Sequence, residues 1–169
     1  MTAVVPTRLL MMTALEDPIN DSWTTITIVT STPLASTAAA SWDVFGVDFG
    51  GWAAWTTGIT KSDLNGPVAV GVECINKTSV GVLTQELTAF DEVTRSLTYT
   101  IRSGMPAPIA GASNSWSIEE AGEGSSRFVG RAVFELKWWA IPLRALLRCK
   151  MDGSLSTFTG EVSSRMAAA

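Results

Sequence analysis

Three neutral polar side chains fall on the apolar phase of segments that alternate between apolar and polar residues. Gln85, Tyr99 and Asn114 each keep the phase of large apolar neighbours two positions away. Because successive side chains of a strand point to opposite faces, we expect all three to point inward. If they were buried without a partner, they would lose their hydrogen bonds to water. We therefore expect each to form a hydrogen bond with a ligand, another side chain or a trapped water. Such groups can polarise a carbonyl, and they are the candidate catalytic residues.

The chain contains no histidine among its 169 residues. A Ser-His-Asp triad, a Cys-His dyad and a zinc site built on histidine are therefore excluded for this chain. Cys74 and Cys149 stand far apart without a CxxC spacing. This pattern favours two reduced thiols and predicts no metal site. We expect no cofactor.

Composition predicts one globular domain, because 46% of the residues are apolar and the length is that of a single domain. A domain of this size buries roughly 70% of its unfolded surface, enough for a core and a ligand cavity. A net charge of -4 and no run of Lys or Arg argue against nucleic acid as a partner. No segment approaches the ~20 apolar residues of a membrane span, and Leu9–Met12 is too short for a signal peptide. We expect a cytoplasmic monomer or homodimer.

The elements that must position these residues follow from the hydrophobic period. Residues 1–22 carry no sustained period and predict an N-terminal arm, followed by a domain over 23–166. A β-branched strand is expected at Thr24–Thr30, then two short helices at Leu34–Phe45 and Asp48–Trp55. A long helix is expected from Pro142. Turn signals divide the middle of the chain into six strands, at Gly58–Leu64, Pro67–Asn76, Val80–Phe90, Ser96–Ser103, Ala112–Glu120 and Ser126–Trp138.

This order predicts an α+β fold in which a strongly curved antiparallel sheet of about seven strands wraps around the C-terminal helix. One helix cannot fill the concave face of such a sheet, so an internal ligand cavity is expected. The Pro-marked loop from Ser103 to Pro108 is placed to cover an opening of that cavity.

Four segments, taken in order and spacing, resemble the START-like, Bet v 1-like superfamily (SRPBCC) with its helix-grip fold, especially its polyketide cyclase/dehydrase-like branch. The resemblance runs from about Trp23 to the C-terminus. Two departures stand out: Gln85 replaces a usual Glu, and Gly130 replaces a frequent Trp, which implies a less charged or roomier pocket. The segments are 42–55, 66–71, 85–101 and 122–135.

The resemblance implies an elongated pocket for a hydrophobic or polycyclic small molecule. Lys61 is a candidate because its segment resembles the one that carries a ligand-pairing lysine in plant hormone receptors of the superfamily. The alternative is a solvated lysine on a strand. The pair Trp138 and Trp139 is interpreted as a structural plug. The candidate ligand-binding residues are Trp55, Lys61, Leu83, Leu87, Ile101, Trp116, Phe134, Leu155 and Phe158.

Two classes of function remain open. The first is a cofactor-independent cyclase of natural-product biosynthesis that positions a flexible polyketide-like or terpenoid-like intermediate for an aldol-type or pericyclic ring closure. Positioning alone can lower such a barrier by ~7–11 kcal/mol. The second is a non-catalytic carrier or sensor of a lipid or aromatic ligand, which needs the same cavity and no chemistry.

Overall fold

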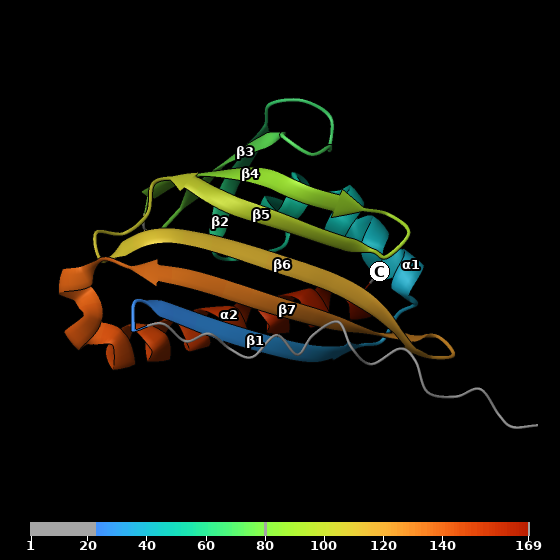
Figure 1. Cartoon of the computed structure of the whole chain (residues 1–169). Helices are drawn as coiled ribbons and strands as arrows, with labels where there is room; N and C mark the ends of the chain where they lie inside the picture. The colour runs from blue at the N-terminus through green and yellow to red at the C-terminus, as the bar shows by residue number, and fades with distance from the viewer. Residues whose placement is uncertain (1–22, 80, 169) are drawn as a thin grey trace, which may run out of the picture.

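Seven strands form a single antiparallel sheet in the computed structural model, which describes residues 23–79 and 81–168 (Figure 1). Their spatial order is β1-β7-β6-β5-β4-β3-β2, so the first strand returns to pair with the last. The predicted arm, 1–22, lies outside the described residues. The strands are β1 (Thr25–Leu34), β2 (Ile59–Leu64), β3 (Glu73–Thr78), β4 (Gly81–Asp91), β5 (Ser96–Ser103), β6 (Ile109–Gly122) and β7 (Ser125–Leu136).

The helices are α1 (Ala38–Trp42), the π-helical turn η1 (Asp43–Val47), the 3-10 turns η2 (Gly51–Ala54) and η3 (Trp138–Leu143), and the long α2 (Arg144–Ala167). Thr37 begins α1, because its side chain accepts a hydrogen bond from the Ala40 N–H. The predicted α+β fold, a curved sheet with a long C-terminal helix, is confirmed. No helix of the described residues is long and apolar enough to cross a membrane.

Several predicted boundaries were wrong; β6, for example, starts at Ile109 and not at Ala112. Leu34 extends β1, where it pairs with Ser126, so the first helix starts four residues later than expected. The strand expected from Pro67 starts at Glu73, because Gly66 and Gly71 take positive φ and residues 66–72 form a loop. The strand expected to reach Trp138 ends at Leu136, and Trp138 begins η3.

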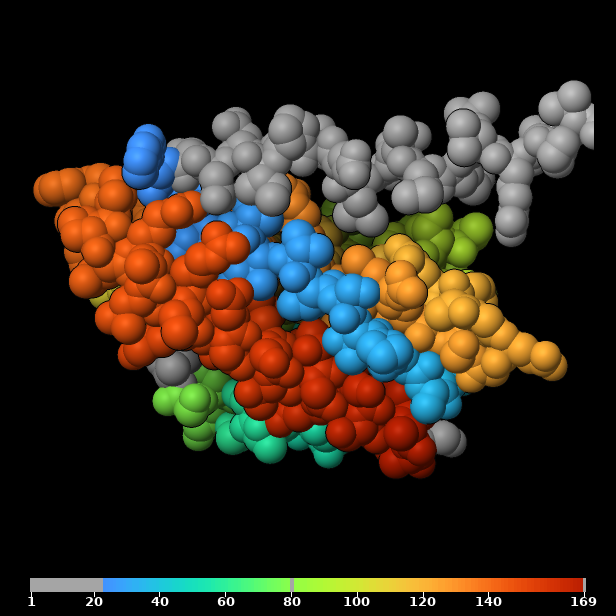
Figure 2. Space-filling model, turned by 90° about the horizontal axis from the view of Figure 1, so that it is seen from below, coloured from blue at the N-terminus to red at the C-terminus, as the bar shows by residue number. Residues whose placement is uncertain are grey.

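Helix α2 lies against the concave face of the sheet, beside β1 at its edge (Figures 1 and 2). Aromatic rings fill the space between sheet and helix at one end, which we call the aromatic end. Phe45 at its centre is fully buried, with ring centroids 4.8 Å from both Trp52 and Phe128. Phe158 of α2 and Trp116 of β6 join the same group, 5.5 Å apart.

Aliphatic and methionine side chains dominate the other end of the interior, which we call the hollow end. Buried Ile26, Ile109 and Leu136 form its sheet side, and Leu147 and Met151 of α2 pack against them. The cavity described below lies between Met105, Ile109, Leu147 and Met151 of this end and the rings of Trp52, Trp116 and Phe158 at the edge of the aromatic end. Helix α2 therefore spans both ends, with Phe158, Val162 and Met166 in the aromatic group and Leu147 and Met151 in the other.

Candidate functional site

A cavity of about 580 Å³ lies between the sheet and the first half of α2. Nine of the twelve candidate site residues line it. The first seven come from strands β4 to β7 through the alternation of their side chains, and the last two come from one face of α2. They are Leu83, Gln85, Tyr99, Ile101, Asn114, Trp116, Phe134, Leu155 and Phe158.

The three neutral polar residues lie on three neighbouring strands of the cavity wall. Tyr99 of β5 is directly opposite Asn114 of β6, and Gln85 of β4 is opposite Ile101, two residues from Tyr99. All three are buried. The sequence phase therefore placed them together at the wall, and their roles in binding or chemistry stay a prediction.

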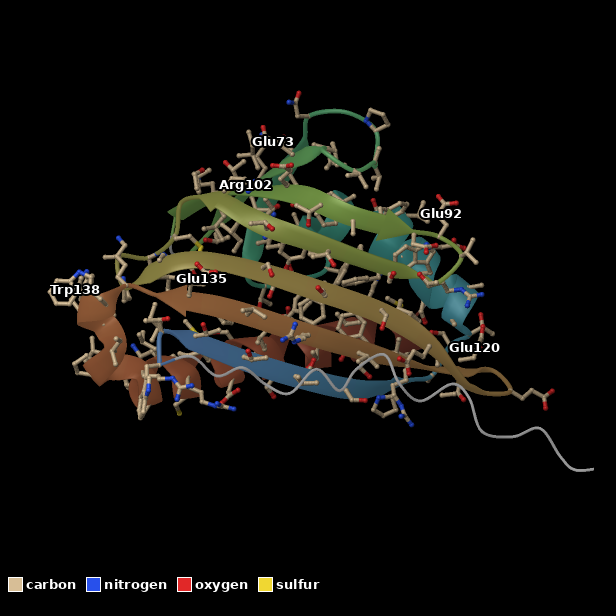
Figure 3. All side chains as sticks on the ribbon, in the orientation of Figure 1. Glu73, Glu92, Arg102, Glu120, Glu135 and Trp138 are labelled. Carbon is tan, nitrogen blue, oxygen red and sulfur yellow. The ribbon has the colours of Figure 1, made fainter. Side chains whose placement is uncertain are left out.

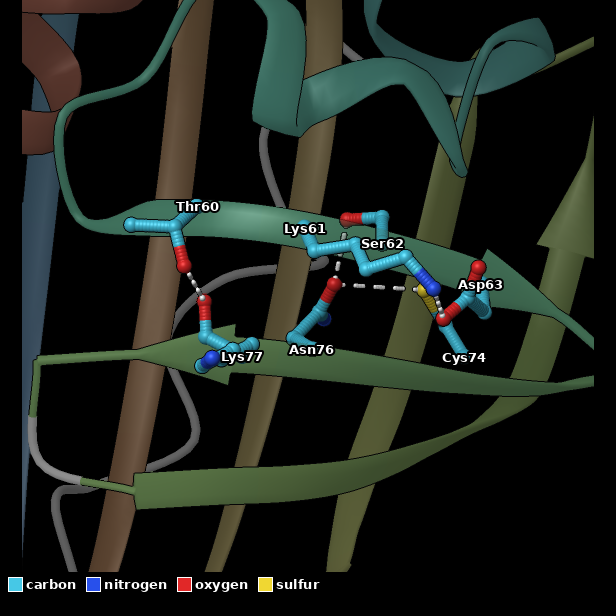
Figure 4. A network of polar contacts seen from close by, with 7 residues as sticks. All are labelled: Thr60, Lys61, Ser62, Asp63, Cys74, Asn76 and Lys77. Atoms are coloured by element: carbon cyan, nitrogen blue, oxygen red, sulfur yellow. Dashed lines mark hydrogen bonds and ion pairs between the residues drawn. The ribbon is translucent and has the colours of Figure 1, made fainter.

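A hydrogen-bond chain fixes the orientation of Gln85. Its Oε1 accepts from Asn76 Nδ2 at 2.9 Å. Asn76 Oδ1 in turn accepts from the Ser62 hydroxyl at 2.5 Å and from the Cys74 thiol at 3.4 Å (Figure 4). Burial raises the pKa of the Cys74 thiol, so this group stays protonated and can donate. With its carbonyl oxygen engaged, Gln85 keeps its amide N–H groups for a partner in the cavity.

Tyr99 remains a neutral hydrogen-bond donor over the ordinary pH range. Burial raises the pKa of its hydroxyl to about 12, although the neighbouring polar groups of Trp116 and Asn114 oppose this rise. A phenol held in its protonated form can donate to an acceptor such as a carbonyl oxygen and does not serve as a base.

Trp116 occupies the space that Gly130 leaves on the adjacent strand. The two residues are opposite each other in the β6–β7 pair, and a Cβ atom at position 130 would lie 2.0 Å from Cζ3 of the Trp116 ring. The roomier pocket expected from Gly130 is therefore not present at that point, because a tryptophan from the neighbouring strand fills it. The indole Nε1 of Trp116 has no hydrogen-bond partner among the described residues.

A family profile described as "Polyketide cyclase / dehydrase and lipid transport" matches residues 25–162, which span every strand and most of α2. The chain belongs to this family. The superfamily recognised from the sequence is thereby confirmed. A comparison with curated proteins found no match.

Solved structures share the fold of this polyketide cyclase/dehydrase family member at low identity. The Zhui aromatase/cyclase from Streptomyces sp. R1128 superposes with a TM-score of 0.73 at 13% identity, over 85% of this chain and 94% of that one. Norcoclaurine synthase from Thalictrum flavum gives 0.70 at 14% identity, over 85% and 95%. A protein from Thermobifida fusca gives 0.70 at 24% identity, over 84% and 93%.

Lys61 does not line the cavity of this family member. A bulge in β2 between Ile59 and Lys61 breaks the alternation, so Ile59 lines the cavity while the Lys61 side chain is 66% exposed. Its ammonium group pairs with Asp63 at 2.5 Å on the outside of the sheet (Figure 4). The structure thus fits the alternative interpretation, a solvated strand lysine.

Two other candidates also lie outside the cavity, both in the packing of the aromatic end. Leu87 is fully buried there, because it stands one inward position beyond Gln85, opposite Tyr99. Trp55 follows η2 and stacks on Phe158 with centroids 6.2 Å apart. The interpretation of Trp138 and Trp139 as a plug was wrong as well, since Trp138 is 80% exposed.

Sequence reasoning missed several wall residues. Lys150 lines the cavity beside Leu147 and Met151, and it carries the only charged side chain among the described lining residues. The helical spacing of positions 147, 150, 151 and 154 contains this signal, because these positions share one face of the helix. The loop expected to cover an opening contributes Met105, Pro106 and Pro108 to the wall. The other wall residues outside the candidate set are Trp52, Ile59, Ile109, Leu147, Met151 and Ser154.

Proposed function

We propose that the protein binds a hydrophobic small molecule in this cavity and acts as a cofactor-independent cyclase on a flexible polyketide-like or terpenoid-like intermediate. The observation that carries the proposal is the pairing of a mostly apolar wall with Gln85, Tyr99 and Asn114 on three adjacent strands. A purely apolar container would not need three buried polar groups, whose loss of water must be compensated by hydrogen bonds.

The cavity has the dimensions and composition of a ligand site. Its volume of about 580 Å³ lies within the roughly 300–1,000 Å³ of typical small-molecule sites. Trp52, Trp116 and Phe158 present aromatic side chains to the ligand, while Met105 and Met151 adapt to irregular shapes. These features favour a ligand that is largely apolar and contains or forms rings.

In the proposed mechanism the chain contributes shape and hydrogen bonds. The wall holds the intermediate folded, so that the two carbons to be joined lie close together, and this positioning can be worth ~7–11 kcal/mol. The Gln85 amide N–H and the Tyr99 hydroxyl donate to a carbonyl oxygen and stabilise the negative charge that develops on it. Lys150 pairs with an anionic group at the end of the ligand nearest the N-terminal half of α2.

The comparisons support this proposal at the level of family. The matching family is described by polyketide cyclase and dehydrase activity and by lipid transport, and one structural neighbour is an aromatase/cyclase. Another neighbour, norcoclaurine synthase, was solved with dopamine and hydroxybenzaldehyde. These activities and ligands are those of the family and of the neighbouring proteins. For this chain, they favour a small, ring-containing ligand.

The test is conversion of a linear polyketide intermediate, made in situ by a minimal polyketide synthase, into cyclised products. We expect the protein to change the ratio of ring-closed products, and we expect Tyr99→Phe and Gln85→Leu each to lower the rate of the enzyme-directed closure by roughly 10²-fold. Thr100→Val, which alters the opposite face of β5, is the matched control and should retain the rate. An unchanged rate in both cavity variants would remove the proposed hydrogen-bond roles.

A carrier of lipids or aromatic molecules is the second candidate, and the observation that favours it is the absence of a carboxylate among the described lining residues. A carrier needs no acid or base. Native mass spectrometry of the protein after exposure to a total lipid extract separates the two. Recovery of intact fatty acids alone, with no conversion of the polyketide intermediate, would favour the carrier over the cyclase.

A further inference from the structure

Exposed tryptophans gather at one end of the molecule, the end that holds the hollow part of the interior. Trp138 and Trp139 in η3 are 80% and 45% exposed, and Trp23 is 81% exposed. Trp23 lies at the same end, because the Leu136 N–H donates to the Thr24 carbonyl at 2.6 Å. Three of the other tryptophans, Trp42, Trp52 and Trp116, are buried, so exposure is a property of this end.

The same segment is strongly cationic in an acidic chain. Residues 137–150 contain four of the twelve Lys and Arg residues and no Asp or Glu, although the chain as a whole carries -4. Arg144 donates to the Thr25 carbonyl at 3.0 Å, which holds its charge at this end. The nearest acids in sequence are Glu135 and Asp152, and Arg148 lies 4.0 Å from Asp152. The opposite end carries acidic side chains such as Glu92 and Glu120 (Figure 3).

The cavity is walled by the neighbouring elements of this end. Met105, Pro106 and Pro108 of the β5–β6 loop and Lys150 of α2 belong to its lining. The loop is joined to η3 by a hydrogen bond from the Lys137 N–H to the Pro108 carbonyl, at 3.0 Å. A surface that docks through η3 would therefore bring the rim of the cavity close to whatever it binds.

We propose that this end is a docking surface for an anionic lipid bilayer. The surface, here named the tryptophan–cation surface, consists of Trp23, Lys137, Trp138, Trp139, Leu143, Leu146 and Arg148. Tryptophan is favoured at the headgroup level of a bilayer, leucine enters the adjacent acyl region, and Lys and Arg bind anionic headgroups. The first turn of α2 contains no acidic residue, so the helix dipole adds to the positive potential.

Charge argues against a second copy as the occupant. In a symmetric pairing the same surface of two copies would meet, which would bring their cationic clusters together. A bilayer instead offers negative charge and an apolar layer at the depths where this surface presents cations and tryptophans. Docking would let a hydrophobic ligand pass between bilayer and cavity, and that second step alone rests on the proposed function.

The experiment is co-sedimentation with vesicles of phosphatidylcholine alone and of phosphatidylcholine mixed with phosphatidylglycerol. We expect partitioning into the anionic vesicles to exceed that into neutral ones by roughly 25-fold, since Lys137 and Arg148 contribute about fivefold each. We expect release at ~1 M salt, where exposed charges are screened. This comparison uses the unaltered protein, so it does not depend on the folding of any variant.

Two variants then locate the surface. Trp138→Ala with Trp139→Ala should lower partitioning by on the order of tenfold or more, and Lys137→Gln with Arg148→Gln by roughly 25-fold. Val93→Ala with Arg127→Gln, exposed positions at the opposite end, is the matched control and should bind as the parent does.

Equal binding to neutral and anionic vesicles, no binding at low salt, or equal loss in the control would each overturn the proposal. A dimer by light scattering that dissociates with the tryptophan variant, in a protein that ignores vesicles, would assign the surface to self-association instead. Ligand binding in solution is measured separately, so failure of docking and failure of the proposed function are distinguishable.

Discussion

The two ends of the interior are covered by the same helix and the same sheet, yet one is filled and the other encloses a cavity. At the aromatic end Phe45, Trp52, Phe128 and Phe158 contact one another at ring separations of 4.8–6.5 Å. At the hollow end the facing side chains include Met105, Leu147 and Met151, and about 580 Å³ stays open. Side-chain volume, and not the path of the backbone, therefore determines which part of the interior is a packed core and which part borders a cavity.

The largest expected contrast compares one phenylalanine from each end. Phe45→Ala should lower the free energy of unfolding by about 4 kcal/mol, because it removes a fully buried ring from close packing and leaves a new void. Phe134→Ala, at the cavity wall, should cost less than half as much, because its ring already borders open space. Urea denaturation measures both. Equal losses would show that the two ends are packed alike.

The second prediction concerns alkaline pH and the boundary between the two ends, where Tyr99 lies. The folded protein holds the Tyr99 proton up to about pH 12, while the unfolded chain loses it near pH 10.0. As pH rises through this window the unfolded state binds fewer protons, so stability should fall by about 2–3 kcal/mol in all. Tyr99→Phe should remove this part of the pH dependence. A variant that follows the same slope as the parent would mean that Tyr99 titrates normally and is not enclosed.

Substitution of Gly130 tests how tightly the side chains of the aromatic end are packed. Gly130→Ala would drive its Cβ into the Trp116 ring, and we expect a loss of about 2 kcal/mol together with displacement of the indole toward the cavity. Gly111→Ala, also in the β6–β7 region, is the matched control, because its Cβ would meet mainly the flexible end of Glu135 at 3.2 Å. Thermal denaturation and near-ultraviolet circular dichroism report both effects. Tolerance of Ala at 130 would mean that Trp116 is loosely held.

The smallest effect concerns the helix that both ends share. Gly153 and Gly160 lie in α2 with open space around a built Cβ, so Gly153→Ala and Gly160→Ala should each stabilise the protein by about 1 kcal/mol. Equal gains at the two sites would confirm that the helix backbone is alike along its length. A loss of stability in the Gly153 variant alone would show that the hollow end depends on a flexible helix. Side-chain volume would then not be the sole difference between the two ends. Urea denaturation of the two variants, measured side by side, distinguishes these outcomes.

Period two in the strands was sufficient to predict the sheet and most of the strand side of the cavity wall, because alternation fixes which residues face inward. It placed Gln85, Tyr99 and Asn114 on the cavity wall and failed at Lys61, where a bulge resets the alternation. A bulge leaves no reliable mark in a single sequence. Nor did the sequence show that Asn76 orients Gln85, since that contact joins two strands whose register depends on the whole sheet.

The central claim is that a ligand binds at the hollow end, contacts only the cavity-lining rings of the aromatic end, and leaves the packing around Met166 unchanged. Methionine methyl groups mark the two ends, with Met105 and Met151 at the cavity wall and Met166 buried in the aromatic cluster. In a methyl-labelled NMR titration with an anthraquinone carboxylate, assigned by Met→Leu variants, we predict saturable shifts of the Met105 and Met151 resonances and no shift of Met166. Shifts of Met166 as large as those of Met151, or no shift of Met105 and Met151 at saturating probe, would contradict the account.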